Sequence, residues 1–154
     1  MITGVLMTLA HVERPTDLVR VLVVDDHRTF SELLSGALAS AGMDAVGTAH
    51  SAAQAVAMAQ ELQPDVVVMD IEMPRQDGLA ATRRIREVAP DAVVAVVTAH
   101  RDPDWVVRAA QAGASAVSPK DGSLPEMIDV LSRGQPGQML VAPSTVASGA
   151  PRTA

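Results

Sequence analysis

Short apolar runs alternate along the chain with longer stretches in which apolar residues recur every three or four positions. A short continuous apolar run is typical of a buried strand, whereas the longer spacing is typical of a helix with one buried face. The predicted strands are Val19–Val24, interrupted only by Arg20, and Ala45–Ala49, Val66–Met69, Ala92–Val97 and Ala114–Val117. The pattern therefore predicts five strands separated by helices.

Helix signals follow each of the apolar runs. A serine followed three residues later by Gln or Glu, the capping-box pattern, occurs at Ser51 and Ser123. Asp102 is predicted to cap the fourth helix, with Pro103 at its first position. The five expected helices begin near Phe30, Ser51, Gly78, Asp102 and Ser123, and they end near Ala41, Leu62, Pro90, Gly113 and Gly134.

Continuous apolar strands separated by helices predict a parallel sheet that is covered by helices on both faces. We expect a doubly wound, five-stranded α/β domain with right-handed crossovers and the common strand order 2-1-3-4-5. The pattern places this domain over residues 18–134, after an N-terminal extension over residues 1–17. Residues 135–154 are rich in Pro, Gly, Ser, Thr and Ala and are predicted to be a flexible linker or tail.

The composition excludes several kinds of site. Lys and Arg number 12 against 18 Asp and Glu, which gives a formal net charge of −6 without any basic run, so direct binding to nucleic-acid phosphates is not expected. Cysteine is absent, which excludes disulfides and thiolate metal sites. No apolar run is long enough to cross a membrane, and the apolar opening lacks the basic start of a signal peptide. We therefore expect a cytoplasmic protein, whether translation starts at Met1 or at Met7.

Polar residues follow four of the predicted strands at their carboxyl ends. Asp25 and Asp26 follow the first strand, Asp70 the third and Thr98 the fourth, and Lys120 comes shortly after the fifth. In open parallel sheets, ligands bind beyond these ends, at the position where the strand order reverses. With the order 2-1-3-4-5 this position lies between the first and third strands, so we expect these five residues to meet there.

Three carboxylates in one crevice repel one another unless a divalent cation lies among them. Mg²⁺ prefers oxygen ligands, usually from one or two carboxylates, water and phosphate. With this charge neutralised, one carboxylate is able to attack phosphorus and form an aspartyl phosphate. Lys120 would offer a positive charge to the phosphoryl oxygens and Thr98 a hydroxyl. The constellation predicts a Mg²⁺-dependent phosphorylation site, although Asp25 and Asp26 could also act as helix caps.

Four segments resemble the signature motifs of response-regulator receiver domains of bacterial two-component systems. They are VLVVDDH (21–27), VVVMDIEMPRQDG (66–78), VVTAH (96–100) and SPKDGS (118–123). The resemblance extends from about Val19 to Gly134 and implies the flavodoxin-like receiver fold. It implies that Asp70 is both the phosphoacceptor and a metal ligand. Asp26 would bind Mg²⁺ directly, Asp25 would bind it through water, and the backbone carbonyl of Glu72 would complete the protein ligands. By the same resemblance, Thr98 is the switch hydroxyl and Lys120 contacts the phosphoryl group.

The resemblance also implies the partners of the chain. The phosphoryl donor would be a phosphohistidine of a sensor histidine kinase, and phosphorylation would switch an output surface and favour homodimerisation. His27 after the acidic pair and Asp121 after Lys120 are most similar to receivers that precede a LuxR-type helix-turn-helix. We therefore expect a role in transcriptional control, with DNA reached only through an effector domain that is not present in this chain. Such a domain is a regulatory phosphoacceptor and not an enzyme.

Two positions depart from the family pattern. Val117 stands where the family usually has an aromatic switch residue, three positions before the lysine. Pro119 precedes Lys120, and because proline lacks an N–H donor it predicts a short fifth strand. Glu72 and His100 occupy positions that tune the loss of the phosphoryl group in the family, with ordinary solvated loop residues as the alternative. Trp105 is predicted to be a packing residue of the fourth helix, with a role at an interface as the alternative.

Two other functions stay open as alternatives. A phosphatase similar to haloacid dehalogenases would also form an aspartyl phosphate, but it needs a second Asp two residues later as acid and base, and this position is Glu72. A degenerate receiver would act only as a protein-interaction module, and the complete set of acids, hydroxyl and lysine argues against it.

Overall fold

The centre of the molecule is a parallel sheet with the strand order β2-β1-β3-β4-β5-β6, seen in a computed structural model that describes residues 18–100, 102–135 and 137–143. The strands are β1 (Arg20–Val24), β2 (Asp44–Ala49), β3 (Val66–Asp70), β4 (Val93–Thr98), β5 (Ala116–Pro119) and β6 (Leu140–Val141). The helices are α2 (Arg28–Ser40), α3 (Ala52–Leu62), α4 (Gly78–Val88), α5 (Asp104–Gln111) and α6 (Leu124–Arg133). The doubly wound α/β fold and the predicted order of the first five strands are confirmed.

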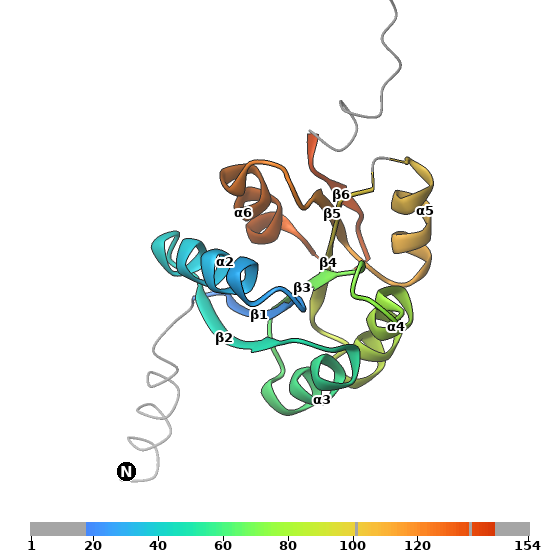
Figure 1. The fold of residues 1–154 in the computed structure, drawn as a ribbon, viewed down its shortest axis with the longest axis horizontal. Coiled ribbons are helices and arrows are strands. Elements are labelled where there is room, and N and C mark those ends of the chain that lie inside the picture. Colours follow the sequence, from blue (N-terminus) through green and yellow to red (C-terminus); the bar gives the residue numbers. More distant parts are fainter. Residues whose placement is uncertain (1–17, 101, 136, 144–154) are drawn as a thin grey trace, which may run out of the picture.

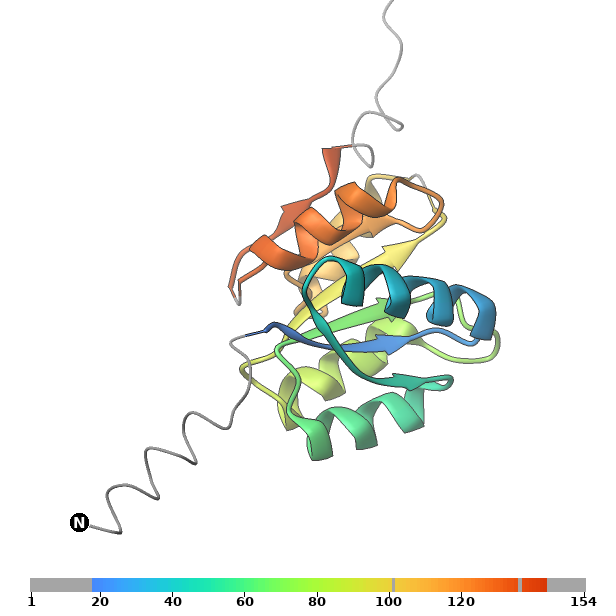
Figure 2. The same ribbon diagram turned by 90° about the vertical axis from the view of Figure 1, so that its left-hand side faces the viewer.

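Helices cover both faces of the sheet (Figures 1 and 2). Helices α2 and α6 pack on one face, and helices α3, α4 and α5 pack on the other. Every residue of β3 and β4 is buried, because alternate side chains of these central strands point into the two opposite layers. No helix of the described residues has the length and apolar character that would let it cross a membrane.

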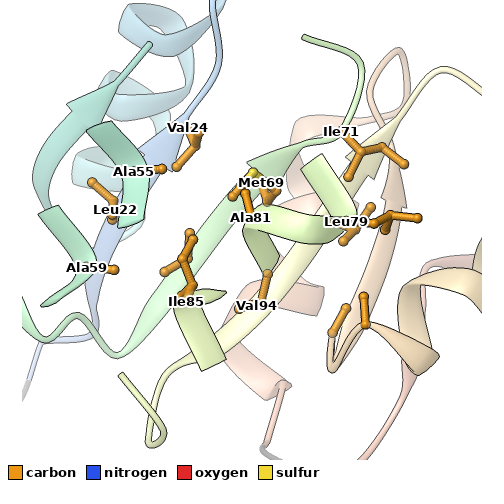
Figure 3. Packing of buried hydrophobic residues seen from close by; sticks show 14 of the residues in the cluster. Leu22, Val24, Ala55, Ala59, Met69, Ile71, Leu79, Ala81, Ile85 and Val94 are labelled. Carbon is orange, nitrogen blue, oxygen red and sulfur yellow. The ribbon is translucent and has the colours of Figure 1, made fainter. Parts of the chain in front are cut away.

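One of the two cores lies between the sheet and helices α3 and α4 (Figure 3). Ile85 of α4 is fully buried in the same cluster as Leu22 of β1 and Val94 of β4. Burying a side chain of this size contributes about 2 to 3 kcal/mol to the free energy of unfolding. This packing holds the first, third and fourth strands in register, and their carboxyl ends carry most of the polar residues described below.

Side-chain caps define the starts of three helices. Ser51 accepts a hydrogen bond from the backbone N–H of Gln54, and Ser123 accepts one from Glu126, as the capping boxes predict. Helix α4 begins at Gly78 as predicted. The side chain of Asp77 caps this helix by accepting hydrogen bonds from the backbone N–H groups of Leu79 and Ala80.

Most element boundaries differ from their predictions by one or two residues, and the starts of α5 and β5 have a clear local cause or consequence. Helix α5 begins at Asp104, one residue later than expected, because Pro103 is its N-cap residue and Asp102 instead accepts a hydrogen bond from the N–H of Asp104. Strand β5 begins at Ala116, two residues later than expected, and extends through Pro119, so the prediction of a short fifth strand is confirmed. Proline is tolerated there because it is the last residue of the strand.

The sixth strand was not predicted. It lies within residues 135–154, which were expected to form a linker or tail, and its two residues pair in parallel with Ala116 and Val117 of β5. Residues 139–142 (MLVA) form an apolar run of four residues, which is a weak strand signal, but the Pro, Gly, Ser and Thr residues around it led to the prediction of a linker. The edge of β5 supplies the hydrogen bonds that complete the strand. The residues from 144 onwards lie outside the described part of the chain.

Candidate functional site

The polar residues that follow the strands gather at one edge of the sheet, as expected. Asp25 follows β1 directly, Asp70 and Thr98 are the last residues of β3 and β4, and Lys120 follows β5. Oxygen or nitrogen atoms from Asp25, Asp26, His27 and Asp70 all lie within 4.8 Å of one another. The site therefore combines residues that are widely separated in sequence, and the parallel register of β1, β3 and β4 brings them together.

Lys120 links the two buried acids of the site. Its Nζ lies 2.9 Å from Oδ2 of Asp70, to which it donates a hydrogen bond. The same Nζ lies 3.0 Å from Oδ2 of Asp25, an ion pair whose angles fall outside those of a hydrogen bond. The backbone N–H of Lys120 donates to the carbonyl of Thr98 at 2.9 Å, so the lysine is anchored to the end of β4. This anchoring points the ammonium group between β1 and β3.

Asp70 is only 2 % exposed, and this burial affects the pKa of its carboxyl group. Loss of solvation raises the pKa of its carboxyl above the ordinary 3.8, and the charge of Asp25 adds to this rise. Hydrogen bonds from Lys120 and from the backbone N–H of Glu72 oppose the rise without cancelling it. For Lys120, burial lowers the pKa, but the hydrogen bond to Asp70, the close contact with Asp25 and the charges of both carboxylates outweigh burial and raise the pKa above 10.5. Lys120 therefore stays protonated at neutral pH.

The charges of the site do not balance among the described side chains. Three carboxylates from Asp25, Asp26 and Asp70 face one ammonium group from Lys120, so three negative charges less one positive leave two negative charges. Oδ1 of Asp26 is buried and accepts no hydrogen bond from the described residues. An excess of two negative charges and a buried carboxylate oxygen that accepts no hydrogen bond fit a hard divalent cation with oxygen ligands. The residues present are therefore able to hold Mg²⁺.

The hydroxyl of Thr98 is turned toward Glu72. Oγ1 of Thr98 donates a hydrogen bond to Oε1 of Glu72 at 2.8 Å, and the backbone N–H of Ala99 donates to the same oxygen. The backbone N–H of His100 donates to Oγ1 of Thr98 at 3.0 Å. Glu72 is thus a structured part of the rim of the site, and its side chain holds the loop after β4. The structure assigns no ligand to the backbone carbonyl of Glu72, so its role in metal binding stays a prediction.

His27 is a member of the site, although the sequence analysis noted it only for its resemblance to one group of receivers and did not predict it as a site residue. Its Nδ1 lies 3.2 Å from Oδ1 of Asp25 and 3.3 Å from Oδ1 of Asp26, and its backbone N–H donates to Asp25 at 2.8 Å. Nδ1 of His50 lies 2.8 Å from the carbonyl oxygen of Asp25 and supports the same loop from β2. The position of His27 directly after the acidic pair was the only signal, and its contacts depend on the turn into α2.

Trp105 lies on the rim beyond His100. The rings of His100 and Trp105 are stacked, with centroids 4.6 Å apart and an interplanar angle of 16°. The guanidinium carbon of Arg108 lies 4.3 Å from the centroid of the Trp105 ring. Trp105 also packs against the core shared with α3 and α4, which confirms the prediction of a packing residue. Its role at an interface stays a prediction.

A cluster of acids bridged by a lysine, at the carboxyl edge of a doubly wound parallel sheet, defines the class of receiver domains. The chain belongs to the response regulator receiver domain family, whose family model matches residues 21–132. Among curated proteins, the response regulator GacA of Pseudomonas viridiflava is 38% identical over 127 residues, which is 82% of this chain and 59% of GacA. The chain thus spans about three-fifths of the length of such relatives.

Other similar proteins differ in their names and in the share of their length that this chain covers. A protein-glutamate methylesterase/protein-glutamine glutaminase of Geobacter metallireducens is 44% identical over 67% of this chain and 30% of that protein. A LuxR-family two-component response regulator from Aurantimonas has a similar structure, with a TM-score of 0.76 and 28% identity over 86% of this chain and 95% of that one. The receiver domain of NarL from Mycobacterium tuberculosis aligns with a TM-score of 0.68 and 34% identity over 73% of this chain and 91% of that one. The flavodoxin-like receiver fold is therefore confirmed.

Proposed function

We propose that Asp70 accepts a phosphoryl group from a phosphohistidine of a sensor histidine kinase. The observation that supports this assignment is the contact of the buried Asp70 carboxylate with Lys120, inside a cluster that also contains Asp25 and Asp26. In the transfer, an oxygen of Asp70 forms a bond to phosphorus while the bond from phosphorus to the donor imidazole breaks. Lys120 stabilises the negative charge on the phosphoryl oxygens, and it remains protonated throughout.

Asp25, Asp26 and Asp70 would hold the Mg²⁺ ion, with the backbone carbonyl of Glu72 as a further ligand. When bound, the ion supplies the positive charge that offsets the excess of carboxylates and the incoming phosphoryl oxygens. Lys120 keeps Asp70 and Asp25 at a short separation before any phosphoryl group arrives. The site is thus arranged in advance for transfer, which lowers the cost of reorganisation.

Thr98 links the site to the rest of the molecule in this proposal. Its hydroxyl, now donated to Glu72, would turn to a phosphoryl oxygen when Asp70 is modified. This change would free Glu72 from one of its two donors and loosen the loop that leads to His100 and Trp105. Val117 has no aromatic ring, so the rotation of a ring at this position is not available as a switch. We therefore expect the loop after β4 to be the element that moves.

We further propose that the chain controls transcription in the cytoplasm, as part of or together with a DNA-binding effector. The GacA relatives and the LuxR-family structure support this assignment, since both are similar to this chain over more than four-fifths of its length. Under this proposal residues 18–134 are the receiver and residues 1–17 are an extension. The receiver itself acts on no separate substrate, and it reaches DNA only through the effector.

Incubation with acetyl phosphate and Mg²⁺, followed by intact-mass measurement, tests the proposal. We expect a gain of one phosphoryl group in the wild type, none after chelation of Mg²⁺, and none in Asp70→Asn. Asp91→Asn removes a carboxylate from an exposed turn and should retain the full adduct. An unmodified wild type, or an undiminished adduct in Asp70→Asn, would refute the assignment. Sustained hydrolysis of a generic phosphate ester would instead support the phosphatase alternative.

A further inference from the structure

The junction between β2 and α3 contacts the loop that follows β1 and carries two of the predicted metal ligands. The backbone N–H of Asp25 donates a hydrogen bond to the carbonyl of Ala49, the last residue of β2, at 3.0 Å. Nδ1 of His50 lies 2.8 Å from the carbonyl oxygen of Asp25 and donates to it, because a carbonyl oxygen only accepts. Both backbone polar groups of Asp25 are therefore held by the end of β2 and the residue that follows it.

The same junction holds the loop between β3 and α4, through the side chain of Gln76. Oε1 of Gln76 accepts a hydrogen bond from the backbone N–H of Ala52, the first residue of α3. This N–H is one of the amides at a helix start that have no carbonyl partner within the helix. Ser51 caps a different amide of the same turn, that of Gln54. Gln76 thus completes the start of α3 from a loop that is distant in sequence.

The loop that carries Gln76 is closed at its base and turns sharply beside this residue. Its two ends touch, since a Cβ on Gly78 would lie 2.5 Å from Cα of Ile71. Arg75 has a φ of +60°, a left-handed conformation that is unfavourable for a residue with a Cβ. Contacts outside the turn must hold it in place, and the bond from Gln76 to the start of α3 is such a contact.

We propose that Gln76 is a positioning residue for Mg²⁺ binding, and that Gln76 and His50 together clamp the loops after β3 and β1 to the start of α3. Glu72 would offer its carbonyl from one of these loops and Asp26 its carboxylate from the other, so the clamp sets the separation of the two ligands. Mg²⁺ demands nearly ideal octahedral geometry, and a change in this separation weakens its binding. The inference rests on the proposed function, because it concerns the same ion site.

Titration of the full chain with Mg²⁺ by calorimetry tests the clamp at both of its contacts. Gln76→Met removes the acceptor and keeps a side chain of similar length, so the Kd for Mg²⁺ should rise about tenfold. Gln60→Met makes the same change at an exposed position of α3 and should leave the Kd unchanged. His50→Leu removes the donor to Asp25 and should also raise the Kd, whereas His50→Asn retains a neutral N–H donor and should restore most of the affinity.

Two further measurements separate positioning from a merely structural role. In the metal-free chain, the amide of Ala52 should lose protection from hydrogen exchange in Gln76→Met and keep it in Gln60→Met. With acetyl phosphate, Gln76→Met should need more Mg²⁺ for half-maximal modification but reach the same final adduct.

The outcomes distinguish this inference from the proposed function. An unchanged Kd in Gln76→Met, beside a wild type that binds Mg²⁺ and gains the phosphoryl group, would overturn the clamp and leave the role of Asp70 intact. A wild type that binds no Mg²⁺ would overturn both. If Gln76→Met does not fold, the His50 pair decides, and equal Kd values in His50→Leu and His50→Asn would overturn the clamp.

Discussion

Lys120 holds two carboxylates close together across the ends of β1 and β3, where they would otherwise repel each other. The contact makes Asp70 a buried anion with one strong partner, and burial still keeps its pKa above the ordinary value. Such a group destabilises the fold when it is ionised, because the folded state binds its proton more tightly than the unfolded state does. The protein therefore holds Asp70 in an arrangement that favours gaining a cation or a phosphoryl group.

Asp70→Asn should therefore increase the stability of the metal-free protein at pH 7, by on the order of 1 kcal/mol. The stability of the wild type should fall as pH rises from 3.8 through the raised pKa of Asp70, and the variant should lack this fall. The difference between the two proteins should hence be largest at neutral pH and shrink in acid. Urea unfolding at a series of pH values measures it, and a variant less stable than the wild type at pH 7 would contradict the account.

Rules about strand ends predicted much of the site from the sequence. Asp25, Asp70, Thr98 and Lys120 were found because the carboxyl ends of parallel strands converge whatever the loops do. The contacts of His27 and the orientation of the Glu72 side chain could not be predicted in this way. Both depend on the paths of loops, which local sequence determines weakly.

At the scale of elements, β4 could be predicted from the sequence and β6 was not. Strand β4 is a continuous apolar run buried on both faces, so its pattern alone predicts it. Strand β6 lies in the apolar run of residues 139–142, whose signal is outweighed by the surrounding Pro, Gly, Ser and Thr residues, and its pairing with β5 shows it to be a strand. The predicted start of α5 was one residue too early, because Asp102 forms a local turn before the helix and α5 begins at Asp104.

Two helical glycines give an element-scale prediction with a matched control. A Cβ on Gly78 would lie 2.5 Å from Cα of Ile71, so Gly78→Ala should force α4 away from the end of β3 and cost about 2 kcal/mol of stability. A Cβ on Gly36 of α2 would meet nothing within 4 Å, and Gly36→Ala should stabilise the protein by about 0.5 kcal/mol. Thermal unfolding measures both changes. A destabilised Gly36→Ala, or a neutral Gly78→Ala, would show that these helices pack differently.

At the scale of the whole molecule, the site links ion binding to folding. A ligand that binds only the folded state stabilises it in proportion to the logarithm of its concentration, by about 2.7 kcal/mol at one hundred times its Kd. The uncompensated carboxylates around Lys120 make this linkage specific for a divalent cation. The strands that form the cores also carry the predicted metal ligands, so ion binding should stabilise the whole domain against unfolding.

Mg²⁺ should accordingly raise the unfolding temperature of the wild type in a concentration-dependent manner, and Na⁺ at equal ionic strength should not. Asp26→Asn removes the acid whose buried oxygen accepts no hydrogen bond, and it should abolish most of this shift. Asp91→Asn, on an exposed turn, should preserve it. Differential scanning fluorimetry is sufficient for the comparison. Equal shifts in Asp26→Asn and in the wild type would place the ion elsewhere.

Localisation of the phosphoryl group on the chain tests the central claim most directly. An aspartyl phosphate is an acyl phosphate, which borohydride reduces so that the modified aspartate becomes homoserine. Treatment with acetyl phosphate and Mg²⁺, reduction, and peptide sequencing by mass spectrometry should place homoserine at residue 70 alone. Homoserine at residue 25 or 26, or at no residue while the intact mass shows a phosphoryl group, would contradict the assignment of Asp70.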